Sequence, residues 1–154
     1  MSEYRIEKFR YPVIVTMAGG ERIEGDMFVQ AYARFRTGPE EPPDILNGDE
    51  PFFPLVDGRG DTLLIAKDQV MEVEAVVTEE DDEFRRAGLR PEMIEVTLVG
   101  GSALQGAVHV EVAADRPRLL DFLNRFDERF LLLQTTDGVH LINRRYIARV
   151  RPLD

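Results

Sequence analysis

The chain contains two copies of one small pattern. Val15–Gly25, with the sequence VTMAGGERIEG, matches Val96–Gly106, with the sequence VTLVGGSALQG, at an offset of 81 residues. Farther along, Asp44–Asn47 matches Asp121–Asn124 at an offset of 77. The change of offset places four extra residues of the first repeat in a loop with Gly and Pro between positions 29 and 44. A duplicated small domain is therefore the strongest constraint on the fold.

Hydrophobic anchors continue the repeat to the end of the chain. The offset of 77 aligns Phe53 with Phe130, Leu64 and Ile65 with Leu141 and Ile142, Val70 with Ile147, and Val73 with Val150. We therefore predict a first domain over residues 11–77, a linker over 78–92 and a second domain over 93–151. The linker carries acids first and arginines last, which predicts a short charged helix that ends near Gly88 and Pro91.

Alternation of apolar and polar residues predicts β-strands in both repeats. The strand that begins near Arg22 places Met27 and Val29 on one face and polar residues on the other, as in an antiparallel sheet with one wet face. The glycine pair before it, and the equivalent pair in the second repeat, suit tight hairpins. Gly25 and Gly106 inside the long strands predict a bend or bulge.

A helical turn and three short strands complete each repeat. Asp115 and Pro117 predict the start of a helix in the second repeat, and residues 42–48 predict a single turn in the first. The expected closing strands are Phe52–Val56, Thr62–Lys67 and Val70–Val76, matched by Phe130–Gln134, Val139–Asn143 and Ile147–Arg151. Five strands in so short a segment predict a small barrel. Because a domain of about 60 residues buries only about 60% of its unfolded surface, we expect the two barrels to pack on each other.

The composition removes several classes of function. The 154 residues include no cysteine, so the chain has no disulfide, no thiolate nucleophile and no cysteine-ligated metal. No run of 18 apolar residues occurs, so no membrane-spanning helix is expected. The charged N-terminus is followed by no apolar run of the kind a signal peptide needs. The expected compartment is the cytoplasm.

The net charge of −10 is unevenly distributed along the chain. Five basic and 13 acidic residues give the first repeat, residues 11–77, a charge of −8, whereas residues 93–154 are balanced. Nucleic-acid binding depends on Lys and Arg that neutralise phosphates. It is therefore disfavoured for the acidic chain as a whole, and only the second repeat is a candidate for it.

The glycine and hydrophobic spacing of both repeats resembles the Sm-like (LSm) small β-barrel. The first Sm motif is filled by Val15, Met17, Gly20, Ile23, Gly25 and Met27, and again by Val96, Leu98, Gly101, Leu104, Gly106 and Val108. The second motif is met by Ile65, Val70 and Val73, and again by Ile142, Ile147 and Val150. The resemblance implies a mainly β chain of two tandem five-stranded Sm-like/SH3-like small barrels. Each barrel has a short helical turn inserted, and a short charged helix or linker joins them. The order of elements is also similar to that of uncharacterised bacterial domains.

The departures from the Sm pattern lie on the loops with which an Sm-like protein holds an RNA base. Sm-like RNA binders carry Asp-x-x-hydrophobic-Asn shortly after the second glycine. Here Asp121–Asn124 is one residue shorter and comes 15 residues after Gly106. The Arg-Gly positions of the second motif hold Asn143-Arg144 and Ala66-Lys67. The resemblance therefore specifies the fold better than the function.

Six residues are candidates for binding. They are Asp44 and Asn47, their counterparts Asp121 and Asn124, and Arg144 and Arg145 at the start of a basic C-terminal strand. The Asp and Asn side chains can hydrogen-bond a base or a peptide, or they can satisfy backbone groups around a helical turn. The arginines can meet RNA, or an acidic protein face, the first repeat of the chain included.

We predict no catalytic, cofactor-binding or metal-ligating residues. His109 and His140 share no ligand spacing, and Ser102 lies in a glycine hairpin without a nucleophile elbow. Arg86 and Arg90 resemble half of the cyclic-di-GMP signature of PilZ domains, but its Asp/Asn-x-Ser-x-x-Gly half is not matched.

These patterns together favour a non-enzymatic protein-interaction or scaffold module. A five-stranded partial barrel leaves edge-strand donors and acceptors that can pair with another protein or with a second molecule of the same chain. The alternative is RNA or nucleotide binding by the second repeat. An enzyme is the third possibility.

Overall fold

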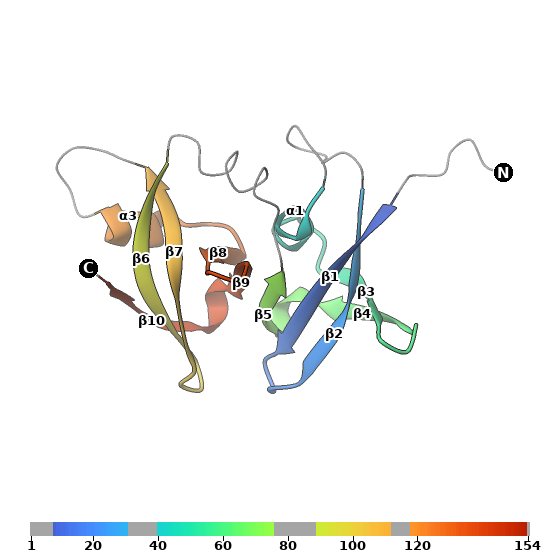
Figure 1. Ribbon diagram of the computed structural model, residues 1–154. Coiled ribbons are helices and arrows are strands. Elements are labelled where there is room, and N and C mark those ends of the chain that lie inside the picture. Colours follow the sequence, from blue (N-terminus) through green and yellow to red (C-terminus); the bar gives the residue numbers. More distant parts are fainter. Residues whose placement is uncertain (1–7, 31–39, 76–88, 112–117, 154) are drawn as a thin grey trace. The chain divides into compact units, whose positions relative to one another are not determined.

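The computed structural model describes residues 8–30, 40–75, 89–111 and 118–153 (Figure 1). The chain divides into two compact units, Met1–Ala75 and Val76–Asp154, which we call the first and the second unit. The described residues are mainly β, as predicted. None of the described helices has the length and apolar character that crossing a membrane requires.

The first unit is an antiparallel sheet of five strands with one helical turn. Its elements are β1 (Lys8–Met17), β2 (Arg22–Gln30), α1 (Pro42–Leu46), β3 (Phe52–Asp57), β4 (Thr62–Ala66), the 3-10 turn η1 (Lys67–Gln69) and β5 (Val70–Ala75). The strand order is β5-β1-β2-β3-β4. Gly20 has φ +94° in the β1–β2 turn, a conformation that favours glycine over any residue with a side chain.

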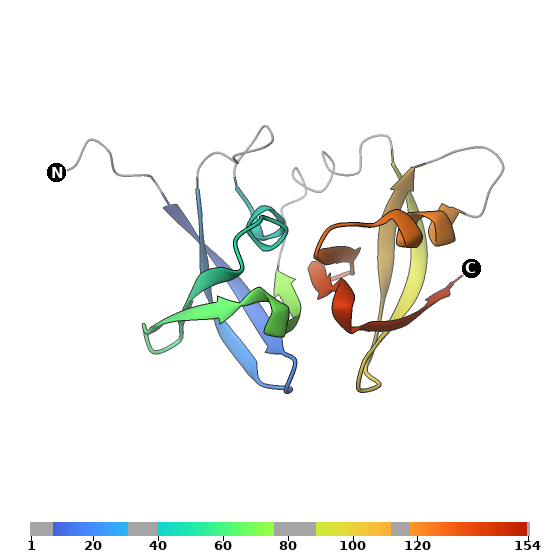
Figure 2. The same cartoon turned by 180° about the vertical axis from the view of Figure 1, so that it is seen from behind.

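The second unit repeats this arrangement. Its elements are β6 (Leu89–Leu98), β7 (Ala103–Glu111), α3 (Arg118–Arg125), β8 (Phe130–Gln134), β9 (Val139–Asn143), the 3-10 turn η2 (Arg144–Tyr146) and β10 (Ile147–Pro152). The strand order is β10-β6-β7-β8-β9, which is the order of the first unit strand for strand. The helical turns of both units are seen from behind in Figure 2, α1 and η1 in teal and green, α3 and η2 in orange and red.

Backbone hydrogen bonds recur at equivalent positions of the two units. Ala18 donates its N–H to the carbonyl of Gln69 at 2.8 Å, and Val99 donates to Tyr146 at 2.8 Å. The ladder between the first and last strand is irregular in both units, after Thr16 in one and after Ile147 in the other. The repeat in the sequence is therefore a repeat of topology and of local geometry.

The core of each unit lies on the inward face of its strands, and two glycines let the strands approach. A Cβ on Gly25 would lie within 3.0 Å of the carbonyl oxygen of Val56 in β3. A Cβ on Gly106 would lie equally close to the carbonyl oxygen of Gln134 in β8. Both glycines are thus required by backbone packing where β2 crosses β3 and β7 crosses β8.

One predicted alignment is out of register by one residue. Phe53 is opposite Ile65, whereas the residue opposite Ile142 is Leu131, so Phe53 corresponds to Leu131 and not to Phe130. The cause is the length of the connection between the last paired residues. Residues 57–61 separate Val56 from Thr62 in the first unit, whereas only residues 135–138 separate Gln134 from Val139 in the second. A hydrophobic anchor in each strand does not reveal a turn that differs by one residue.

The sheets are not closed into barrels. Within the described residues of the first unit no ladder joins β4 to β5, and within those of the second none joins β9 to β10. A 3-10 turn, η1 or η2, connects these two strands in each unit, and the strands lie at opposite ends of the unit's strand order.

The predicted linker over 78–92 extends too far. Leu89–Glu92 belong to β6, where Pro91 lies opposite His109. The ladder between β6 and β10 covers only Ile94–Leu98, so this part of β6 pairs with β7 alone. Proline is tolerated in such an edge segment. The rest of the predicted charged helix, residues 78–88, lies outside the described residues, and so do Asp115 and Pro117.

Candidate functional site

Asp44 lies in the N-terminal turn of α1, where it satisfies the backbone. Its Oδ2 accepts a hydrogen bond of 2.8 Å from the N–H of Glu41, the N-cap residue of the helix. The N–H of Asp44 donates in turn to the carbonyl of Glu41 at 2.9 Å. An acid at this position also complements the partial positive charge of a helix N-terminus. Asp44 thus has a structural task, which is one of the two uses expected for it.

Asn47 ends the same helical turn. It is the C-cap residue of α1, and its N–H donates to the carbonyl of Pro43 at 2.9 Å. Beside it, the ammonium group of Lys67 donates to the carbonyls of Ile45 at 2.6 Å and Gly48 at 3.3 Å. Lys67 is only 1% exposed, which is rare for lysine, so η1 holds a buried cation against the C-terminal end of α1.

The second unit uses the same device with a different cation. Arg144 occupies the position of Lys67 at the start of its 3-10 turn, and its guanidinium donates to the carbonyl of Phe126, just beyond α3. Asp121 is half-buried and Asn124 is exposed, both on α3. The structure therefore brings Arg144 to the end of the helix that carries Asp121 and Asn124.

Arg145 follows on the exposed side of η2. Its backbone N–H donates to Oδ1 of Asn143 at 3.0 Å, so the side chain of Asn143 caps this 3-10 turn. Arg144, Arg145, Arg149 and Arg151 are all exposed, and we call these four residues with η2 and β10 the arginine strand. No acid lies among residues 143–153.

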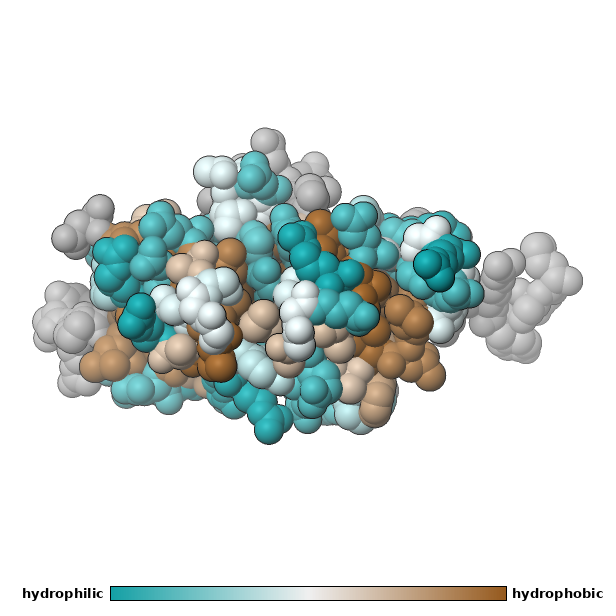
Figure 3. Space-filling model, turned by 90° about the horizontal axis from the view of Figure 1, so that it is seen from below, coloured by the Kyte–Doolittle hydropathy of each residue, from teal (hydrophilic) through white to brown (hydrophobic). Residues whose placement is uncertain are grey.

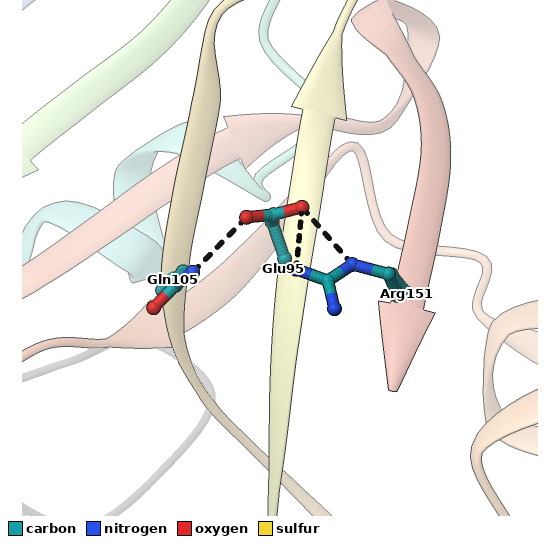
Figure 4. A network of polar contacts seen from close by, with 3 residues as sticks. All are labelled: Glu95, Gln105 and Arg151. Atoms are coloured by element: carbon teal, nitrogen blue, oxygen red, sulfur yellow. Dashed lines mark hydrogen bonds and ion pairs between the residues drawn. The ribbon is translucent and has the colours of Figure 1, made fainter. Parts of the chain in front are cut away.

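A polar network joins three strands of the second unit (Figure 4). Glu95 on β6 accepts a hydrogen bond of 3.0 Å from Gln105 on β7 and two, of 3.2 and 3.1 Å, from the guanidinium of Arg151 on β10. The hydrogen bond from Gln105, then that from Arg151, hold the pKa of Glu95 below its usual 4.5. The sequence analysis missed Glu95, although it lies opposite Arg151 in the strand register.

The equivalent strands of the two units carry opposite charges. In the first unit, Ile14 and Thr16 of β1 lie opposite Glu74 and Glu72 of β5. The same positions of the second unit pair Glu95 with Arg151 and Thr97 with Arg149. β5 thus carries two negative and β10 two positive charges, so these matching strands account for half of the charge difference between the repeats.

The hairpin of β3 and β4 presents apolar residues to the surroundings. Phe52 is 56% exposed and Leu64 is 72% exposed, and Leu64 lies opposite the exposed Pro54. We call Phe52, Pro54 and Leu64 the apolar face. Phe130 and Leu141, which correspond to Phe52 and Leu64 in the second unit, are 1% and 0% exposed. Figure 3 shows hydrophobic side chains, in brown, that reach the surface among hydrophilic ones.

The two histidines, Ser102 and Arg90 lie on different parts of the second unit. His109 on β7 lies opposite Pro91 and His140 on β9 lies opposite Leu133, and no group of three metal-ligating side chains occurs among the described residues. Ser102 is exposed in the β6–β7 turn. Arg90 forms an exposed ion pair of 3.7 Å with Glu92, and Arg86 lies outside the described residues.

Comparisons with protein-family models, with curated proteins and with solved structures found no match. The resemblance to Sm-like proteins therefore rests on the residues quoted above. The features that bear on function are the end strands of the sheet, the exposed apolar side chains and the charged side chains of the two units.

Proposed function

We propose that the chain is a non-enzymatic interaction module, made of two divergent units with Sm-like sequence motifs, that binds protein partners through its end strands. The observation that carries the proposal is that β4 and β10 are the end strands of the strand order. Among the described strands β4 pairs with β3 alone and β10 pairs with β6 alone, which leaves one edge of each strand to pair with another chain. The absence of cysteine fits action in the cytoplasm.

The side chains at the β4 edge support the same function. An exposed hydrophobic residue on an edge strand is usually guarded, because it invites pairing with other chains. β4 instead carries the exposed Leu64 beside Phe52 and Pro54 of β3. Backbone groups of the edge give affinity to an added strand, and the alternating side chains give it specificity.

Selection of linear peptides against the full chain tests this function. Peptides from a random library are selected, and their binding sites are mapped by hydrogen exchange of the backbone amides. We expect protection to appear in β4 or β10, and Leu64→Asp to weaken binding of the peptides that protect β4. Leu120→Asp, at a residue that is 60% exposed on α3, is the matched control and should bind as the unchanged chain does. Peptides that protect only α1 or α3, or a selection without binders, would contradict the proposal.

RNA binding by the second unit is the second candidate, favoured by the exposure of all four arginines of the arginine strand. It predicts salt-dependent binding of labelled single-stranded RNA in fluorescence anisotropy, weakened in Arg144→Ala combined with Arg145→Ala. Arg144 already donates to the carbonyl of Phe126 and Arg151 to Glu95, so the strand offers fewer of its donors to phosphates or to carboxylates of a partner.

A further inference from the structure

The apolar face lies in an acidic surround. Asp49 and Glu50 lie shortly before β3, Asp57 ends β3, Asp61 directly precedes β4, and Asp68 follows β4 in η1. Against these five acids, residues 49–69 contain only two bases, Arg59 and the buried Lys67. A partner that covers Phe52 and Leu64 is therefore expected to carry positive charge around an aliphatic centre.

The arginine strand of the same chain has this character. It alternates exposed arginines with Ala148, Val150 and Pro152, and the aliphatic stems of arginine cover apolar surface while their charged ends stay in water. The equivalent strand β5 of the first unit carries Glu72 and Glu74 where β10 carries Arg149 and Arg151. β10 therefore complements the acidic surround, and β5 does not.

We infer that the apolar face of one molecule binds the arginine strand of a second molecule of the same chain. This inference rests on the proposed function and names the partner. The contact joins different surfaces, β3–β4 on one molecule and η2–β10 on the other, so it is a head-to-tail contact. Because β4 and β10 each pair on one side only, the two strands can also pair through their backbones.

Sedimentation velocity of the full chain over a series of protein concentrations is the first measurement. We expect the sedimentation coefficient to rise with concentration, and the rise to be smaller at high salt, because screening weakens the arginine–acid attraction. A chain that sediments as a monomer at every concentration overturns the inference. It leaves the proposed function standing, since the peptide selection tests that function independently.

Two single variants each damage one side of the contact. Leu64→Asp places a charge in the apolar face, and Arg149→Glu reverses a charge of the arginine strand. Each is expected to weaken association by about tenfold or more, as an unpaired or like charge in an interface costs at least about 1.4 kcal/mol. Leu120→Asp, an equally exposed leucine of the second unit, should associate as the unchanged chain does. Equal association of Leu64→Asp and the unchanged chain would rule the apolar face out.

Mixing the two variants tests the head-to-tail geometry. Leu64→Asp retains an intact arginine strand and Arg149→Glu retains an intact apolar face, so an equimolar mixture should form a one-to-one dimer and stop there. A contact between identical surfaces would leave both molecules of any pair damaged, and the mixture would stay monomeric. A monomeric mixture therefore overturns the inference. Circular dichroism of each variant verifies that the fold is retained.

Discussion

At the scale of single residues, the two units are constrained by the same backbone crossing. Gly25 and Gly106 lie where one strand passes a carbonyl oxygen of the next, and a Cβ at either position would lie within 3.0 Å of that oxygen. The obstacle is backbone in both cases, so it cannot move away as a flexible side chain would. The glycines are needed for close approach, not for an unusual φ.

Gly25→Ala and Gly106→Ala are each expected to lower the free energy of unfolding by about 1–3 kcal/mol, as overpacking does. Gly19→Ala is the control, since a Cβ there meets nothing within 4 Å, and it should change stability by less than about 0.5 kcal/mol. Chemical denaturation measures all three variants. Equal stability of Gly25→Ala and Gly19→Ala would refute the close approach.

Glu95 predicts a small dependence of stability on pH. Its pKa is held below 4.5 in the folded chain by Gln105 and Arg151, so its contribution is complete above pH 4.5 and is lost as pH falls through the lowered pKa. An NMR titration of the Glu95 carboxyl should give a midpoint below 4.5, and Arg151→Ala should raise it. An unchanged midpoint in Arg151→Ala would show that the guanidinium does not act on this carboxylate.

At the scale of elements, each unit fastens its helical turn with a cation from the 3-10 turn. Lys67 binds the carbonyls at the end of α1, and Arg144 binds the carbonyl of Phe126 beyond α3. The short α1 has only five residues and cannot be stable alone. The buried ammonium group of Lys67 stabilises α1 by binding carbonyl groups at its C-terminal end.

Lys67→Met is expected to destabilise the first unit by about 1.5–3 kcal/mol, the range for losing hydrogen bonds from a charged group. Because Arg144 is exposed, Arg144→Met should cost about 0.5 kcal/mol or less. Because the chain has no tryptophan, denaturant unfolding of the two variants is followed by circular dichroism. Similar small losses in both would show that burial of Lys67 contributes nothing to α1.

The elements also show what sequence reasoning reached and where it stopped. Alternation and glycine pairs located the long hairpins, because their periodicity follows from one buried and one wet face. The single helical turn predicted over residues 42–48 is present as α1, Pro42–Leu46. The register of β8 was missed because one residue of turn length leaves no hydrophobic signal, and Pro91 was taken as a helix stop although an edge segment of β6 accommodates it.

The candidate site was less accessible to sequence reasoning than the fold. Burial of Lys67 contradicts the usual exposure of lysine, so composition gave no sign of it. The exposure of Phe52 and Leu64 could not be predicted either, because hydrophobic residues are usually buried and their counterparts in the second unit are buried. The offset of 77 already aligns Glu72 and Glu74 with Arg149 and Arg151, but only the register of the strands shows that Glu95 lies opposite Arg151.

At the scale of the whole molecule, the chain is a duplication whose two units kept their strand order and diverged in charge and exposure. The first repeat carries −8 and residues 93–154 carry no net charge. The topology is shared, so the difference lies in surfaces.

Residue-resolved hydrogen exchange of the full chain tests the availability of β4 and β10 most directly. β1 and β6 are paired on both sides, so in the dilute monomer their amides should exchange slowest. Alternate amides of β4 and β10 should exchange quickly in the dilute monomer and gain protection when a selected peptide or a second molecule binds. Amides of β4 and β10 that are protected as strongly as those of β1 and β6 in the dilute monomer would contradict an interaction module built on these two edges.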